Sequence, residues 1–153
     1  MLNKQLTLLK TEMTLFDEAI KQMEYSMEKC APLVIKNTNE YNSEDLEHIE
    51  AYTARFARLS DMYLKKIIRI VAAMEGYSPL SLRENLELGE KLGFIKSAAV
   101  LLEIRVFRNE IAHEYIPLTQ SNIFMEVNRI IPMLNENIAV TKAYLYRNNW
   151  LIK

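Results

Sequence analysis

The chain has 153 residues, of which half are apolar and a quarter are charged, and its net charge is −1 at pH 7. This balance fits one globular domain with a buried core over residues 1–153, and it excludes a disordered chain or a strongly basic nucleic-acid binder. With three Gly and four Pro, tight turns are few, so long helices with short connections are expected.

The sequence also indicates where in the cell the protein is expected to be found. Residues 1–10 lack the continuous apolar stretch of a signal peptide, and no run of roughly 18 apolar residues occurs, so we expect neither secretion nor a membrane span. Cys30 is the single cysteine and cannot form an internal disulfide. A buried thiol and a reducing, cytoplasmic setting are therefore expected.

Two long helices are predicted in the first half of the chain. In the first, apolar residues recur at alternating spacings of four and three, which marks one apolar seam of a bundle helix: Leu2, Leu6, Leu9, Met13, Phe16, Ile20, Met23, Met27 and Cys30. A polar loop at 37–42 follows, with Ser43 as the expected N-cap of a second helix that runs to about Glu75 and stops at Gly76.

The second half predicts three more helices. Ser78 or Ser81 opens a short one, which Gly93 closes. A long helix then runs until Pro117 ends it near Tyr115 or Ile116, because the residue before a proline avoids the α region. A last helix is capped by Thr119, extends towards Arg147 and is expected to kink at Pro132. The predicted fold is an all-α, up-and-down bundle of four long helices plus one short helix, without strands.

Several kinds of site find no support in the sequence. One cysteine and two distant histidines do not suit a zinc site, and no glycine-rich phosphate loop or nucleophile elbow is present. His48 stands near Glu44 and Asp45, but a di-iron bundle needs a second such motif on a facing helix. We therefore expect no metal or cofactor, and we interpret His48 as a solvated helix residue.

The stretch RNEIAHEY, residues 108–115, concentrates polar groups near a predicted helix end. Asn109 and His113 are four apart and share one face, while Arg108 and Tyr115 are seven apart and share another. About 140° separates Arg108 from His113 around the helix axis, so a straight helix does not aim both at one atom. Either the long Arg side chain wraps round the helix end, or two copies of the helix meet across a two-fold axis.

These residue types can cleave RNA without a metal. A His takes the proton of the 2′-hydroxyl, which attacks the phosphate, while a second His from a dimer mate protonates the leaving 5′-oxygen. Arg stabilises the charge that grows on the phosphate oxygens. From spacing alone, a purely structural alternative stays open: an ordinary last turn of a helix, with Arg108 in a surface ion pair and His113 beside a carboxylate.

The motif R108-N-E-I-A-H113-E-Y115 resembles the R-x4-6-H motif of HEPN domains. More narrowly, it is similar to the R-x4-H-x-Y form of HepT-like toxins, which are paired with minimal nucleotidyltransferase (MNT) antitoxins in type VII-like toxin–antitoxin systems. The segment ARLSDMYLKKIIRI and the later KLGFI are also similar to the family pattern. The resemblance covers most of residues 1–150, although only the motif is specific, and it implies a HEPN-like bundle.

The resemblance implies a metal-independent endoribonuclease toxin that cuts tRNA or mRNA as a homodimer, its cleft lying between two motif helices. Arg108 would be the phosphate-contacting catalytic residue, His113 the catalytic acid and base, and Asn109 a supporting polar group. Tyr115 would be adenylylated (AMPylated) by the partner nucleotidyltransferase, which places negative charge beside Arg108 and silences the toxin.

One feature departs from a typical RNA-binding protein, since the chain is not basic and shows no strip of alternating aromatic and basic residues. Lys65, Lys66 and Arg69 would add phosphate contacts if their face of the second helix lined the cleft; otherwise they form a solvated face. Two other functions remain open. The chain would be either a non-catalytic HEPN module that binds substrate for a nucleotidyltransferase, or a helical scaffold.

Overall fold

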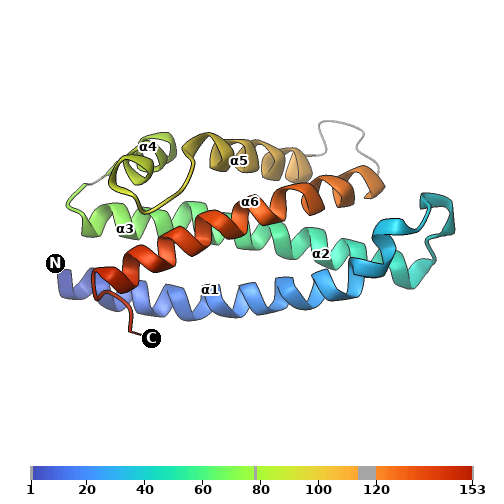
Figure 1. Cartoon of the computed structure of the whole chain (residues 1–153), viewed down its shortest axis with the longest axis horizontal. Coiled ribbons are helices and arrows are strands. Elements are labelled where there is room, and N and C mark those ends of the chain that lie inside the picture. Colours follow the sequence, from blue (N-terminus) through green and yellow to red (C-terminus); the bar gives the residue numbers. More distant parts are fainter. Residues whose placement is uncertain (1, 78, 114–119, 153) are drawn as a thin grey trace.

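The computed structural model describes residues 2–77, 79–113 and 120–152 of the chain, and throughout these ranges the regular structure is helical. Four long helices alternate in direction (Figure 1). α1 (Leu2–Cys30) runs one way, the second helix returns, α5 (Ala98–His113) runs parallel to α1, and α6 (Gln120–Arg147) returns. Both termini therefore lie at one end. The prediction of an all-α bundle with four long helices and one short helix is confirmed for these residues.

The predicted seam of α1 faces the core, with two differences. Leu9, Met13, Phe16, Met23 and Cys30 are buried as expected, as are Ala19 and Ser26. Leu2, the first residue of α1, is exposed. Met27 is exposed because the buried stripe moves back from position 27 to 26 near the end of the helix. The Cys30 thiol is buried, as predicted, and burial raises its pKa to about 11. The thiol is therefore protonated and poorly nucleophilic at neutral pH.

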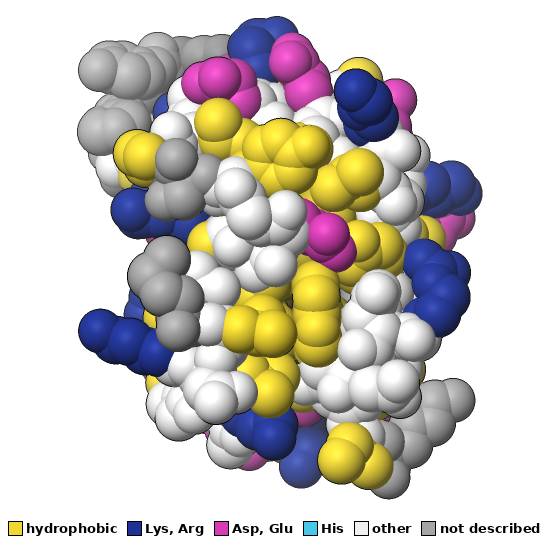
Figure 2. Space-filling view, turned by 90° about the vertical axis from the view of Figure 1, so that its left-hand side faces the viewer, with side chains coloured by type: hydrophobic (Ala, Val, Ile, Leu, Met, Phe, Trp, Pro, Cys, Tyr) yellow, Lys and Arg dark blue, Asp and Glu magenta, His cyan; other side chains and the backbone are white. Residues whose placement is uncertain are grey.

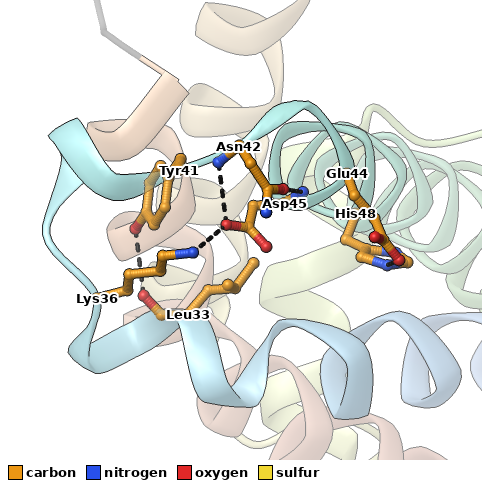
Figure 3. Close-up of polar contacts among 7 residues, drawn as sticks. All are labelled: Leu33, Lys36, Tyr41, Asn42, Glu44, Asp45 and His48. Carbon is orange, nitrogen blue, oxygen red and sulfur yellow. Dashed lines mark hydrogen bonds and ion pairs between the residues drawn. The ribbon is translucent and has the colours of Figure 1, made fainter.

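The link between the first two helices is more structured than the predicted loop. It contains two short 3₁₀ turns, η1 (Ala31–Ile35) and η2 (Thr38–Glu40). α2 (Ser43–Met62) then starts with Asn42, and not Ser43, as its N-cap. The Asn42 side chain accepts from the Asp45 N–H at 2.8 Å, and the Asp45 carboxylate accepts from the Asn42 N–H at 3.1 Å (Figure 3). Lys36 donates to the same carboxylate and, as the largest effect, holds the Asp45 pKa below its usual value.

The second long helix changes its winding in the middle. α2 passes into a π-helical segment, η3 (Tyr63–Ile67), and then into α3 (Ile68–Met74) without a break. In η3 the Ile68 N–H donates to the carbonyl of Tyr63, five residues earlier rather than four. The Tyr63 ring stacks on Phe16 of α1 at 5.8 Å, and its hydroxyl lies 2.7 Å from Thr141 of α6. The widened turn is therefore fixed from two sides.

The short helix α4 (Leu82–Leu92) begins and ends as predicted. Ser81 caps it, since its hydroxyl accepts from the Glu84 N–H at 3.2 Å. Gly93 ends it in the left-handed conformation at φ 92°, and Gly76 ends α3 in the same way at φ 91°. A residue with a side chain would be strained at both positions. These two glycines therefore indicate the helix ends because only glycine adopts this backbone conformation easily.

The last helix, α6, continues through Pro132 and ends at the face of the bundle where both termini lie. Asn149 adopts a left-handed conformation at φ 59°, which turns the chain back so that the Trp150 N–H donates to the Leu145 carbonyl at 2.9 Å. Trp150 then packs on Tyr144 at 6.0 Å. Apolar side chains gather across the middle of this end face (Figure 2). None of the helices described is both long and apolar enough to cross a membrane.

Candidate functional site

The helix that carries the motif, α5, is anchored at its start by side chains from other helices. The Asn137 side-chain oxygen, on α6, accepts from the backbone N–H groups of Lys96 and Ser97 at 2.9 and 3.0 Å. The Glu90 carboxylate, on α4, accepts from the Ala98 N–H at 2.7 Å. The Ala98 N–H is the first of α5 and lacks a partner within the helix, so Glu90 fixes where α5 begins, while Asn137 holds the two residues that lead into it.

The packing of α5 decides which motif residues reach the surface. Leu101, Ile104 and Phe107 are buried at helical spacing and hold the helix against the core. The Phe107 ring lies 5.7 Å from Phe56 of α2. The next residue, Arg108, is therefore half-buried beside α2 and exposes 23% of its side chain.

Arg108 is held by a carboxylate on the neighbouring helix. Its Nε and Nη2 donate to Oδ2 of Asp61, on α2, at 3.1 and 2.9 Å. Both partners are less than a third exposed, and the two bonds fix the plane of the guanidinium. An ion pair of Arg108 is what the purely structural alternative predicts. The pair also holds a cation in one orientation at the edge of a groove, which is what a phosphate site requires.

The groove beside this pair runs between α2 and α5 and has a volume of about 430 Å³. Two alanines and a methionine form the apolar part of its lining, namely Ala54, Ala57 and Met62. Its charged lining consists of Arg58, Asp61, Lys65, Lys66 and Arg108. Four cations against one carboxylate make this a basic groove on a chain whose net charge is −1.

The π-helical segment supplies two of these cations. Tyr63 and Leu64 are buried before them, and Ile67 and Ile68 are buried after them. Lys65 and Lys66 lie between the two buried pairs, and their side chains are 65% and 55% exposed. A widened turn is often found at functional sites. Here its effect is to bring two consecutive lysines to the surface on the side of Arg108.

The other predicted site residues are placed as follows. Asn109 is exposed and does not line the groove, which agrees with its expected position on a different face from Arg108. His113 is the last residue of α5, but the structure describes only its backbone and not its side chain. Tyr115, Pro117 and Thr119 also lie outside them, so the helix stop and the second cap remain predictions.

Only part of this site was predicted from the sequence. Lys65 and Lys66 do line the groove, whereas Arg69, predicted with them, is exposed one turn further along and does not. Arg58 and Asp61 were missed. Their signal was present in the sequence: Arg58 and Asp61 lie seven and four positions before Lys65, which keeps all three on one helical face. Only the position of α5 identifies that face as the groove.

His48 belongs to a different part of the molecule. Its Nε2 lies 3.7 Å from Oε1 of Glu44 in the first turns of α2, and its side chain is 33% exposed (Figure 3). That distance is too long for a hydrogen bond, and the residue is less solvated than predicted. Within the described ranges, no three His, Cys, Asp or Glu side chains come together in a way that would hold a metal ion.

Comparisons with protein-family models, with curated proteins and with solved structures found no significant match to this chain. The site is therefore defined by its own geometry: Arg108 is fixed beside a basic groove, five positions before His113 at the end of α5.

Proposed function

We propose that this protein is a metal-independent endoribonuclease of the HEPN type that acts as the toxin of a HEPN/MNT toxin–antitoxin pair. The observation that carries the proposal is the position of Arg108. It lies in the R-x4-H-x-Y motif and faces a groove with three further cations. A purely structural ion pair would not need this surplus of positive charge around it.

The roles follow from what each group can do at a phosphodiester. The Arg108 guanidinium, fixed by Asp61, contacts a phosphate oxygen and stabilises the charge that grows there during attack. His113 takes the proton from the 2′-hydroxyl, whose oxygen forms a bond to phosphorus. The bond to the 5′-oxygen then breaks, and a protonated His113 of a second protomer supplies the proton to that oxygen. The products are a 2′,3′-cyclic phosphate and a 5′-hydroxyl.

The purified protein is therefore expected to cut single-stranded RNA in the presence of EDTA and to leave cyclic phosphate ends. RNA that carries 2′-O-methyl groups should stay intact, because it lacks the nucleophile. Product ends can be identified by mass spectrometry. Binding of the intact RNA without any cleavage would instead support the non-catalytic module, and cleavage that stops when EDTA is added would contradict the mechanism.

The proposal also assigns an off-switch to Tyr115. Tyr115 follows Arg108 by seven positions in the sequence, so an attached AMP would bring its phosphate towards the Arg108 guanidinium and compete with RNA. Co-expression with a nucleotidyltransferase encoded next to the gene is expected to raise the intact mass by one or more AMP groups. Tyr115→Phe is the control, and a mass increase that persists in this variant would place the modification elsewhere.

A further inference from the structure

The groove between α2 and α5 has features that Arg108 alone does not explain. Arg58, Lys65 and Lys66 have no evident part in bond cleavage, yet they lie along one side of α2 and η3 and converge on the same opening. Arg58 and Lys65 are seven residues apart, which corresponds to roughly 10 Å along a helix. That length is sufficient to face more than one phosphate of a nucleic-acid strand.

The two lysines keep their hydrogen-bonding capacity. Lys65 Nζ lies 3.7 Å from Asp61 Oδ1, and Lys66 Nζ lies 3.7 Å from Glu12 Oε2. Both distances exceed those of a hydrogen bond, so the carboxylates lower the local charge without occupying the ammonium donors. Arg108, by contrast, is hydrogen-bonded to Asp61 at 2.9 Å. Among the described residues the groove thus contains one hydrogen-bonded cation, Arg108, and two lysines whose side chains are more than half exposed.

The lining and the open shape of the groove indicate which kind of anion it would bind. Ala54, Ala57 and Met62 give it an apolar lining between the cations, against which the face of an unstacked base can bury apolar surface. The groove is open to solvent rather than enclosed, so a chain can pass through it. Single-stranded RNA combines a charged backbone with apolar base faces, and double-stranded RNA does not offer those faces.

We propose that this groove, lined by Arg58, Lys65 and Lys66, binds the backbone of single-stranded RNA next to the phosphate held by Arg108. The proposal rests on the proposed function, since it takes RNA as the substrate. It explains how a chain with a net charge of −1 binds a polyanion, because the required positive charge is concentrated in one groove. The π-helical turn of η3 is then part of the binding site, as it presents both lysines together.

The test measures binding apart from cleavage. The probe is a fluorescent single-stranded oligonucleotide with 2′-O-methyl groups throughout, which cannot be cut by 2′-hydroxyl attack, and its binding to the full chain is followed by anisotropy over a range of salt concentrations. Lys65→Ala/Lys66→Ala is expected to weaken binding at least about tenfold. It should also make the plot of the logarithm of the association constant against the logarithm of salt concentration less steep by about 1.4, or about 0.7 for each lost phosphate contact. Arg58→Ala should weaken it in the same sense.

The matched control removes the same charge elsewhere. Lys21 of α1 and Lys91 of α4 are exposed and do not line the groove. Lys21→Ala/Lys91→Ala should therefore keep the affinity within about twofold, since distant exposed charges are screened at physiological salt. Circular dichroism checks that all variants fold. Equal losses in the two double variants would overturn the proposal, because binding would then follow net charge.

Two further results separate the possible failures. A wild-type protein that does not bind the probe, or that binds a polyglutamate peptide of the same charge equally well, would overturn the assignment of the groove to RNA. A protein that binds the probe through Lys65 and Lys66 but leaves unmodified RNA intact would support the groove and contradict the ribonuclease. Binding and cleavage thus fail independently.

Discussion

Arg108→Ala and His113→Ala are each expected to lower the rate constant of RNA cleavage by at least about 100-fold, because in the proposed mechanism they remove the charge-stabilising donor and the acid–base group, respectively. If the protein is the proposed toxin, expression of either variant without the antitoxin should no longer arrest growth. Loss of fold does not explain the result for Arg108→Ala, since a partly exposed Arg–Asp pair contributes only about 0–1 kcal/mol to stability, and circular dichroism checks the fold of His113→Ala. Wild-type toxicity in both variants would show that the motif is not the reaction centre.

Arg108→Lys provides a sharper control. Lysine keeps the charge but cannot make the two-bond contact with Asp61 that fixes the plane of the guanidinium. Activity is therefore expected to stay well below that of the wild type, at a level closer to Arg108→Ala. Full activity in Arg108→Lys would mean that charge alone matters at this position and that the geometry set by Asp61 does not.

Mixing the wild type with His113→Ala tests the shared cleft. If one His113 of each protomer serves the same reaction, a mixed dimer lacks either the base or the acid and is inactive. Random exchange in an equal mixture makes half of the dimers mixed and leaves one quarter wild-type, so the rate should fall from about one half to about one quarter of that of the same amount of wild type. A rate that stays at one half after exchange, or a strictly monomeric protein in light scattering, would contradict a site shared in this way.

Phe56→Ala is expected to lower the free energy of unfolding by about 3–5 kcal/mol, which is the usual cost of removing a fully buried aromatic ring. Phe56 has no exposed surface and packs on Phe107 at 5.7 Å, where α2 meets α5. Urea denaturation followed by circular dichroism measures the change. Phe56→Leu, which leaves a smaller cavity, should cost clearly less. A loss below about 1 kcal/mol in the alanine variant would contradict the packing described between these helices.

The same substitution connects the core to the site. Phe56 lies between groove residues Ala54, Ala57 and Arg58 on α2, and Phe107 directly precedes Arg108 on α5. A cavity here loosens the helix pair that brings Asp61 and Arg108 together. Phe56→Ala should therefore also reduce RNA cleavage at a temperature where the variant remains folded.

The helices could be predicted from the sequence because their signals are local. The apolar seam of α1, the glycine stops at Gly76 and Gly93, and the Ser81 cap depend on residues within one or two turns. The predicted N-cap of α2, Ser43, is one residue after the observed one, Asn42. Both residue types are good caps, and only the reciprocal hydrogen bonds with Asp45 favour Asn42.

The groove could be predicted only in part because it depends on contacts between distant segments. The pair of Arg108 with Asp61 joins positions 47 apart, and nothing near either residue indicates its partner. The π-helical segment was also missed, since the run from Tyr63 to Ile68 has the alternation of an ordinary buried helix. The contacts of Tyr63 at its start, with Phe16 and Thr141, come from other helices and have no signal within the segment.

The start of α5 has a consequence for the order of events during synthesis. The backbone N–H groups of Lys96 and Ser97, which lead into α5, donate to the side chain of Asn137, a residue that is translated well after the motif. Chains are made at roughly 5–20 residues per second, so Arg108 emerges seconds before the side chain that aligns its helix. A nascent or truncated chain that ends before Asn137 therefore carries the whole motif but lacks the side chain that anchors the start of the motif helix. Any activity that depends on the alignment of this helix is then expected only after Asn137 has been synthesised.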